Sequence, residues 1–235
     1  MTVEAHAKIN LTLEVLGTRP DGYHELRSVV APIPLHDDVA FSAAEGDSVS
    51  VEGCDGVPPE KNLARRAALL LREASGCRKG VRITIAKRIP MGAGLGGGSA
   101  DAAAVLTGLN RFWGLGFPVE RLMALGAEIG SDVPALVHGG VVLMEGRGEK
   151  VSPCAGFPTP PWEKLVVYTP PVFSSTARVY GEFRETDRGA GKNDLQPAAC
   201  RLYPGIRDAL RKLEAEGCRD VMMSGSGSTV FGWRE

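Results

Sequence analysis

The sequence predicts an α+β fold, because short strands and helices are mixed along the chain without the regular alternation of a parallel α/β sheet. Its length of 235 residues suits one large domain or two small ones, and 43% of the residues are hydrophobic. Glycine contributes 30 residues, and five of them fall between positions 92 and 98. We therefore expect a folded chain with a specialised glycine loop.

Composition excludes several classes of protein. The chain has 27 basic and 28 acidic residues, so it lacks the strong positive charge typical of nucleic-acid binding. It has neither a membrane-length apolar run nor a signal peptide at its start, and we expect a cytoplasmic protein. The five cysteines are odd in number and far apart, which favours reduced thiols.

The first third of the chain reads mainly as strands. Apolar and polar residues alternate over 8–15, which predicts a half-buried strand with Lys8 and Asn10 on its polar face. Residues 19–22 have the composition of a turn. Further short strands are expected at 29–33, 39–43 and 49–51.

The middle of the chain is predicted to be mostly helical. Asn62 is placed to cap a helix that ends before Gly76. A strand at 81–85 precedes the glycine loop, and a helix opens at Ser99. Pro118 begins another helix, and the run at 130–134 begins a further one, with Ser131 or Asp132 as its cap.

The last part of the chain mixes strands, loops and one clear helix. A helix containing Ile206 is ended by Gly217. The proline-rich run 157–162 is a candidate boundary between lobes, and 186–192 reads as a mobile loop. The expected strands of this part lie at 141–144, 164–169, 221–223 and 229–233.

The glycine loop between a strand and a helix predicts phosphate binding. Glycine lets a ligand approach the backbone closely, and a helix N-terminus presents free N–H groups and partial positive charge. The loop is not a Walker A motif, because Gly98 stands where that motif needs lysine. Gly92, Gly94 and Gly97 match the dinucleotide pattern, but without the expected strand and acidic residue downstream.

At this point the motifs carry a resemblance. Residues 90–99 (PMGAGLGGGS) resemble the second motif of the GHMP small-molecule kinases, and 224–228 (SGSGS) resemble the third. Together with 7–11 (AKINL), 21–26 (DGYHEL) and 130–134 (GSDVP), they are similar to the branch that acts on a cytidine diphosphate ester of methylerythritol in the non-mevalonate isoprenoid pathway. The resemblance implies a two-lobed fold, with a mixed sheet and helices in the N-terminal lobe, a smaller C-terminal α/β lobe, and the active site in the cleft between them.

The resemblance also implies the catalytic pair. The reaction would transfer the γ-phosphate of ATP to the 2-hydroxyl of the methylerythritol unit, with Asp132 accepting the hydroxyl proton. Lys8 would keep that carboxylate ionised and stabilise the attacking oxygen. From the residues alone, a plain helix N-cap is the favoured interpretation of Asp132, and a solvated strand residue is the favoured interpretation of Lys8.

Five further residues are expected to bind the cytidyl diphosphate substrate. By resemblance, His24 reads the edge of the cytosine while aromatic rings sandwich the base. Tyr23 supplies one ring, and Tyr180, preferred over Phe173, supplies the other. Asn10 and Thr176 complete the expected substrate-binding set.

ATP and Mg²⁺ are the expected cofactors, although no residue is assigned as a metal ligand. The loop amides and Ser99 would hold the phosphates, and Asp101 reads as a helix-dipole partner. Asn62 and Lys87 would lie near the adenine or the phosphates. The full expected nucleotide set is Asn62, Lys87, Gly92, Gly94, Leu95, Gly96, Gly97, Gly98 and Ser99.

Domain organisation follows from the same resemblance. An N-terminal domain is expected over 1–155 and a C-terminal domain over 156–235, either compact or shortened at its end. We expect a monomer or a weak homodimer that acts on small molecules. Two alternatives stay open: an NAD-dependent oxidoreductase based on the glycine pattern, and a binding protein of the same fold without catalysis.

Overall fold

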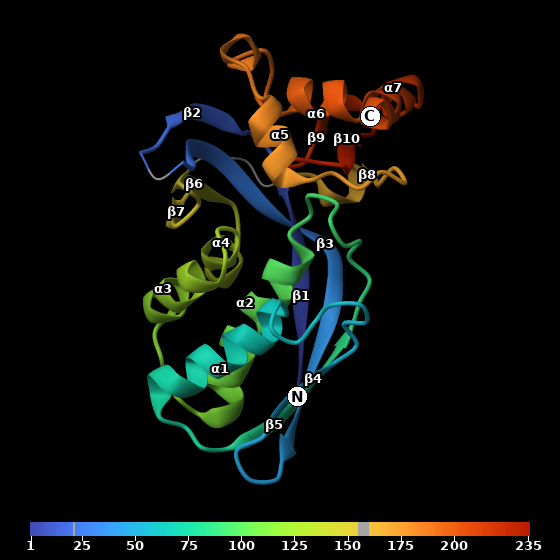
Figure 1. Cartoon of the computed structure of the whole chain (residues 1–235). Helices are drawn as coiled ribbons and strands as arrows, with labels where there is room; N and C mark the ends of the chain where they lie inside the picture. The colour runs from blue at the N-terminus through green and yellow to red at the C-terminus, as the bar shows by residue number, and fades with distance from the viewer. Residues whose placement is uncertain (21, 155–159) are drawn as a thin grey trace. The chain divides into compact units, whose positions relative to one another are not determined.

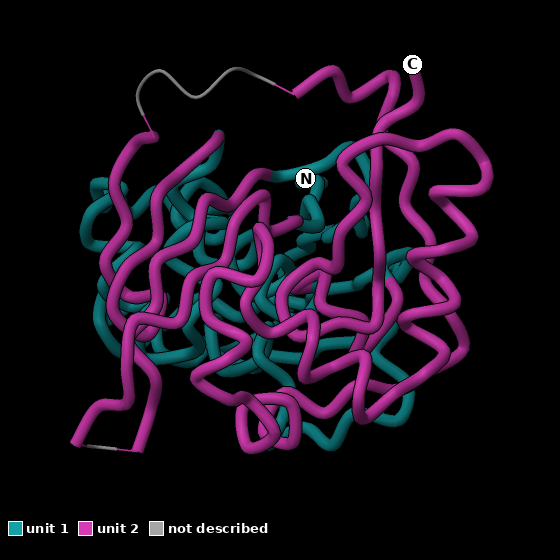
Figure 2. The backbone as a smooth tube through the Cα atoms, turned by 90° about the horizontal axis from the view of Figure 1, so that it is seen from above, with its two compact units in different colours: residues 1–8, 32–89, 97–140 teal, residues 9–31, 90–96, 141–235 magenta. Residues whose placement is uncertain are grey.

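The computed structural model describes residues 1–20, 22–154 and 160–235. The chain forms two compact units, each built from separated stretches of sequence (Figure 2). Unit 1 contains residues 1–8, 32–89 and 97–140, and unit 2 contains 9–31, 90–96 and 141–235. The expected turn residue Asp21 and the domain boundary expected at 155/156 lie outside the described residues.

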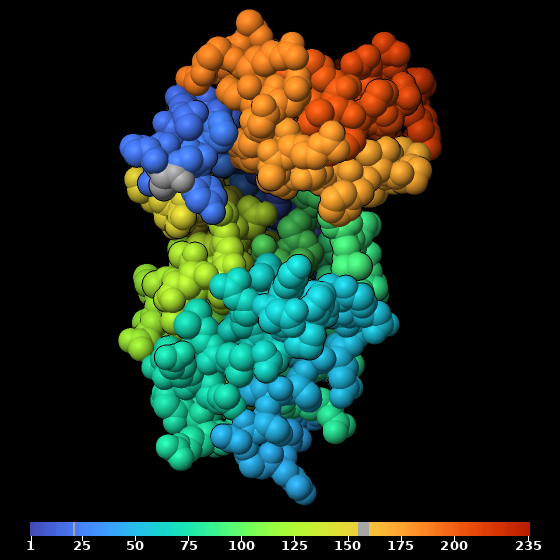
Figure 3. Space-filling model, in the orientation of Figure 1, coloured from blue at the N-terminus to red at the C-terminus, as the bar shows by residue number. Residues whose placement is uncertain are grey.

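Unit 1 combines strands with helices that lie along one side of those strands (Figure 1). In it β3 pairs antiparallel with β5 over residues 38–44, and β5 pairs parallel with β4. The outer face of α1 forms part of the surface of this unit (Figure 3). Its elements are β1 (Thr2–Asn10, which ends in unit 2), the second half of β3 (His24–Ala44), β4 (Val49–Glu52), α1 (Leu63–Ser75), β5 (Gly80–Ala86), α2 (Gly97–Trp113), α3 (Val119–Ile129) and α4 (Val133–His138).

Unit 2 contains two groups of strands. The first half of β3 pairs with β2 and β6, and β6 pairs with β7. A separate antiparallel sheet has the order β8-β10-β9. The elements are β2 (Glu14–Thr18), β6 (Val142–Gly146), β7 (Lys150–Pro153), β8 (Leu165–Tyr168), α5 (Thr176–Glu182), α6 (Gln196–Leu202), α7 (Pro204–Ala215), β9 (Arg219–Met223), β10 (Val230–Trp233) and the 3₁₀ turns Trp162–Lys164 and Glu185–Asp187.

The helix predictions hold well. Asn62 caps α1, since its Oδ1 accepts a hydrogen bond from the Arg65 amide at 3.1 Å, and Gly76 ends the helix with φ 66°. Pro118 is the N-cap of α3, and Leu122, Leu125 and Ile129 are buried on one face of that helix. These elements follow from local capping and periodicity, and the predicted α+β class is confirmed.

One strand prediction is wrong, and two others are right as strands but not as separate elements. The expected strand over 8–15 is β1 followed by a break and then β2, and Lys8 through Leu11 are all buried, so it is not half-exposed. The strands expected at 29–33 and 39–43 are parts of the single long strand β3. Pro32 and Pro34 fit inside β3 because they lie between the β6 ladder at 26–30 and the β5 ladder at 38–44.

In unit 2, helices pack on the sheet β8-β10-β9, and their contact forms the hydrophobic core of the unit. Val179 of α5, Ile206 and Leu213 of α7 and Val230 of β10 are fully or almost fully buried in one cluster. The loop expected at 186–192 lies between α5 and α6, with its first two residues in the 3₁₀ turn Glu185–Asp187 and residues 188–192 outside any helix or strand. Among the described residues, we find no helix that is both long enough and apolar enough to cross a membrane.

Candidate functional site

Lys8 and Asp132 meet within unit 1. Lys8 lies on β1 and Asp132 directly precedes α4, and Lys8 Nζ is 3.5 Å from Asp132 Oδ2. The lysine side chain is 5% exposed and the aspartate side chain is 31% exposed. The buried ammonium therefore faces a carboxylate that keeps one side open to a ligand.

The local fold leaves the Asp132 carboxylate available for this contact. Asp132 occupies the N-cap position of α4, as the run 130–134 predicts, and Pro134 lies in the first turn. Its side chain makes no capping hydrogen bond. The capping interpretation therefore holds for the position of Asp132 in the chain and not for its carboxylate.

Asn10, the second expected site residue of β1, is buried in unit 2. Its side-chain amide donates to Ser28 Oγ at 2.8 Å, and its backbone amide lies 3.4 Å from Ser224 Oγ. Ser28 Oγ in turn donates to the Thr12 carbonyl at 2.6 Å. The Asn10 side chain is thus held in a defined orientation by polar neighbours.

An aromatic cluster forms around His24 in unit 2. The Tyr180 ring stacks on the His24 ring with centroids 4.9 Å apart and 27° between planes, and Phe183 meets His24 edge-on at 6.2 Å. Tyr23 is 56% exposed and lies under the Arg147 guanidinium at 5.1 Å. The structure therefore brings His24 and Tyr180 into contact. Tyr180, which is expected to stack on the base, lies on the ring of His24, which is expected to bind the base edge.

Thr176 and Phe173 lie near the glycine-containing loops of unit 2. Thr176 Oγ1 is 2.8 Å from Ser226 Oγ, which ties the start of α5 to the 224–228 loop. Phe173 is 74% exposed, and a Cβ added at Gly92 would lie 2.6 Å from its ring. Phe173 thus lies against the glycine loop.

Backbone conformation and close packing explain why the 92–96 segment contains glycines. Gly92, Gly94 and Gly96 have φ between 66° and 78°, a region that other residues avoid. A Cβ at Gly94 would come within 2.4 Å of the Ser224 carbonyl oxygen. The Thr229 amide also donates to the Ala93 carbonyl at 3.0 Å, so the two glycine-containing loops pack against each other.

The start of α2 completes the loop and presents backbone amides in unit 1. The helix begins at Gly97, two residues before the expected Ser99. Leu63, the first residue of α1, lies against this turn, since a Cβ at Gly98 would be 3.7 Å from Leu63 Cδ1. Leu95 is 1% exposed, so its side chain anchors the loop in the core.

Lys87 is held between two carboxylates of unit 1. Its Nζ lies 2.5 Å from Asp37 Oδ2 and 2.8 Å from Asp101 Oδ2. Asp37 also accepts from the backbone amides of Arg88 and Ile89, the latter at 2.9 Å. Lys87 therefore ties β3, the residues after β5 and the first turns of α2 together.

Charges in this trio shift one another's pKa. Burial raises the pKa of Asp101 to about 6, against the opposing effect of Lys87. Burial alone would also raise the pKa of Asp37, but hydrogen bonds from Lys87 and the two amides hold it below its usual value. Burial acts to lower the pKa of Lys87, and its bonds to Asp101 and Asp37 outweigh that and raise it.

Several residues that organise the site were missed from the sequence. Asp37 has no distinctive spacing, since its partners Lys87, Arg88 and Ile89 lie far away in the chain. Asn193 donates to the carbonyls of Met223 and Gly225, each at 2.8 Å, and so supports the 224–228 loop. The adjacent pair Asn193 and Asp194 inside a polar run is the one signal that could have pointed to it.

Comparison with known proteins agrees with this geometry. The model of the GHMP kinases N terminal domain matches residues 62–140, and that of the GHMP kinases C terminal matches 176–234. A 4-diphosphocytidyl-2-C-methyl-D-erythritol kinase of Pelotomaculum thermopropionicum is 45% identical over 99% of this chain and 88% of the relative. One of Shouchella clausii is 41% identical over 98% and 84%.

Solved structures extend the likeness to the whole fold. A crystal structure of 4-(cytidine 5'-diphospho)-2C-methyl-D-erythritol kinase superposes with a TM-score of 0.87 at 38% identity, covering 100% of this chain and 90% of that chain. Homoserine kinase from Cytophaga hutchinsonii shares the fold with a TM-score of 0.70 at 21% identity, over 97% and 84%. These matches are all kinases and give the oxidoreductase alternative no support. The chain therefore belongs to the GHMP kinase family, within its group of 4-diphosphocytidyl-2-C-methyl-D-erythritol kinases.

Proposed function

We propose that this chain transfers the γ-phosphate of ATP to the 2-hydroxyl of 4-diphosphocytidyl-2-C-methyl-D-erythritol. The observation that carries the proposal is the Lys8–Asp132 pair, with Nζ and Oδ2 3.5 Å apart and the carboxylate free of a capping bond. Two relatives named as kinases of this substrate match 99% and 98% of the chain. A binding protein of the same fold would have no need of such a pair.

The chemistry needs positioning and charge neutralisation more than covalent help from the protein. The substrate hydroxyl oxygen attacks the γ-phosphorus, and the bond to the β–γ bridging oxygen breaks to release ADP. Asp132 accepts the hydroxyl proton as the new P–O bond forms. Lys8, whose Nζ is 3.5 Å from the carboxylate, offsets negative charge on the attacking oxygen.

The cytidine end of the substrate is assigned to the aromatic cluster of unit 2. His24 offers a ring nitrogen to the base edge, while Tyr180 and Tyr23 offer faces for stacking. The 4.9 Å separation of the His24 and Tyr180 rings supports a shared binding role. Asn10 and Thr176 provide polar groups whose orientation is set by Ser28 and Ser226.

The phosphates of ATP are assigned to the backbone amides of 94–98 and the Ser99 hydroxyl. Positive φ at Gly94 and Gly96 and the N-terminus of α2 support close approach of an anion. Asn62 and Lys87 support this site through the structure around it. Asn62 caps α1 beside the loop, and Lys87 forms ion pairs with Asp37 and Asp101.

Mg²⁺ bound to ATP would supply neutralisation of the phosphate charge. Asp101 is the acidic residue closest in sequence to the loop, and its Oδ1 is buried without a hydrogen-bond partner. Its other oxygen is bonded to Lys87, and the side chain is 5% exposed. A hydrated Mg²⁺ could not reach this carboxylate, so the fit is poor, and we assign the ion to the phosphates and water.

The cellular setting follows from the same proposal. All five cysteines are free, which supports a reducing compartment such as the cytoplasm. We expect the enzyme to act on its small-molecule substrates as a monomer or a weak homodimer.

The direct test is an ATP-consumption assay with four acceptors. We expect turnover with 4-diphosphocytidyl-2-C-methyl-D-erythritol and little with homoserine, mevalonate or galactose. Mass spectrometry of the product should locate the new phosphate on the 2-hydroxyl. Absence of turnover with the first acceptor, from a chain that still binds ATP, would refute the proposal.

A further inference from the structure

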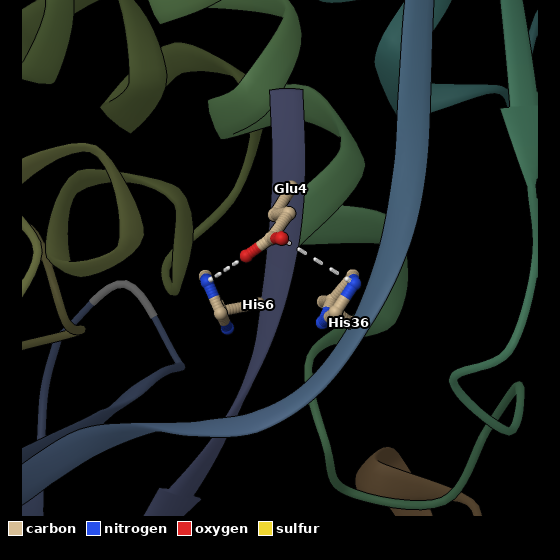
Figure 4. A group of neighbouring side chains, drawn as sticks. All are labelled: Glu4, His6 and His36. Atoms are coloured by element: carbon tan, nitrogen blue, oxygen red, sulfur yellow. Dashed lines mark ion pairs between the residues drawn. The ribbon is translucent and has the colours of Figure 1, made fainter. Parts of the chain in front are cut away.

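A second polar cluster lies on β1 and β3 of unit 1. Glu4 and His6 are two residues apart on β1, and His36 is on β3 (Figure 4). Met1 and Phe41 exchange backbone hydrogen bonds at 3.2 and 2.8 Å, the pattern of an antiparallel pair. Counting along both strands from that pair places His6 opposite His36, and their ring centroids are 5.3 Å apart.

The three side chains converge on one point. His6 Nε2 is 3.1 Å from Glu4 Oε2, and His36 Nε2 is 3.8 Å from Glu4 Oε1. One ligand atom from each residue can be chosen so that all lie within 4.8 Å of one another. Ligand atoms around a tetrahedral zinc ion with bonds of ~2.0–2.1 Å are ~3.3 Å apart, so small side-chain rotations would complete the geometry.

The tautomers of both histidines are set by the backbone. His6 Nδ1 lies 3.0 Å from the Ile33 carbonyl oxygen, and His36 Nδ1 lies 2.9 Å from that of Pro34. A carbonyl only accepts, so each Nδ1 carries the hydrogen, and the lone pair of each neutral ring is on Nε2. This is how metal-binding histidines are oriented, with one nitrogen bonded to a carbonyl and the other facing the metal.

The surroundings supply a further oxygen and an entry path. Asp38 Oδ1 lies 3.4 Å from His36 Nε2, while Asp38 Oδ2 is bonded to Arg88 at 2.5 Å. The His6 side chain is 41% exposed, so an ion can reach the cluster from solvent. Two nitrogen lone pairs and a carboxylate face one another here, an arrangement that a bound cation would relieve.

We propose that Glu4, His6 and His36 bind a divalent transition-metal ion of the zinc class, with Asp38 as an additional oxygen ligand. Imidazole nitrogens suit Zn²⁺, Ni²⁺ and Cu²⁺, whereas Mg²⁺ prefers oxygen alone, so this site is different in kind from that of the nucleotide metal. The ion would join β1 to β3 two residues before Lys8 and stabilise unit 1 by mass action.

The test is Zn²⁺ binding to the full chain, without nucleotide, at a pH of about 7.5 where free imidazole is neutral. Isothermal titration should show one strong site per chain. His6→Gln and His36→Gln should each weaken binding by at least about tenfold, and Asp38→Asn should weaken it less. His138→Gln is the matched control, because His138 is bonded to the Gly139 carbonyl outside the cluster and should bind Zn²⁺ like the parent.

Two further measurements test whether the bound ion lies at this cluster. Co²⁺ used in place of Zn²⁺ should give a visible spectrum of nitrogen and oxygen ligation, without a thiolate charge-transfer band. Zn²⁺ should raise the Tm of the parent chain and leave the two histidine variants unchanged, with circular dichroism confirming that they fold. No strong site, equal binding by His6→Gln and the parent, or a thiolate band would overturn the proposal, whatever the kinase assay shows.

Discussion

Lys8 and Asp132, 124 positions apart in the sequence, place an ammonium nitrogen 3.5 Å from a carboxylate oxygen. The lysine is almost fully buried, and the aspartate is half-buried at the N-cap of α4. A lysine kept from water in this way is expensive to bury without a partner, and Asp132 provides one. Removing Asp132 takes a carboxylate away from the buried Lys8 ammonium, so both chemistry and local structure depend on the pair.

Replacing either member should abolish most turnover. We expect Lys8→Met and Asp132→Asn each to lower kcat by about 10²–10⁴-fold, because proton acceptance and charge stabilisation are both lost. ATP binding, measured by titration, should change little. Lys61→Met, at an exposed lysine of unit 1, is the control. Near-parental kcat in Asp132→Asn would remove the proton-accepting role.

The aromatic cluster should act on substrate affinity and not on ATP. His24→Ala and Tyr180→Ala should raise KM for the cytidyl substrate by about 5- to 150-fold, since stacking on a base is worth about 1–3 kcal/mol. Steady-state kinetics with each substrate varied in turn separates the two effects. An equal rise in KM for ATP, or no rise for the cytidyl substrate, would contradict the assignment, and His138→Ala serves as a control.

Gly94 should tolerate substitution far less than a glycine of the same conformation in open space. Gly94→Ala meets the Ser224 and Gly227 carbonyl oxygens at 2.4 and 2.8 Å, whereas a Cβ at Gly114 has nothing within 4 Å, although φ is 78° and 69° respectively. Gly114→Ala should cost about 1–2 kcal/mol of unfolding free energy from its backbone conformation alone. Gly94→Ala should cost clearly more in urea unfolding. Equal losses of unfolding free energy in the two variants would show that the 224–228 loop moves to make room for the added methyl group.

The Asp101 carboxyl should make the free energy of unfolding increase as pH falls, which is the opposite of the usual effect of a carboxyl group. Its pKa is about 6 in the folded chain, above the ordinary 3.8, so the folded state binds the proton more readily than the unfolded state. Its contribution to the free energy of unfolding therefore rises as pH falls from about 7 to about 4, by at most about 3 kcal/mol.

Asp101→Asn isolates that contribution. We would measure urea unfolding of both proteins at pH values of about 7.5 and about 5, either side of the folded pKa. The stability of the parent relative to the variant should increase at the lower pH, and Asp37, whose pKa lies below its usual value, stays ionised at both pH values. A difference that stays constant or moves the other way would show that Lys87 keeps Asp101 ionised throughout.

How far the sequence predicts the fold depends on the range of the interactions. Both ends of α1 and the start of α3 follow from the sequence, because Asn62, Gly76 and Pro118 act within one turn. The single strand β3 was not, because pairing with β5 and β6 along different stretches decides its continuity. Helices α5 and α6 were missed, since Val179 and Ala199 reveal their faces only when buried in the core of unit 2.

The sequence by itself determined which groups are available: a glycine loop before a helix, an aspartate at a helix start, and a lysine on the first strand. Tertiary structure alone decided which groups meet, so that Lys8 faces Asp132, Lys87 lies between Asp37 and Asp101, and His36 faces Glu4. The physical reason is range. Capping and backbone preferences act over a few residues, whereas contacts between distant side chains exist only after strands have paired and helices have packed.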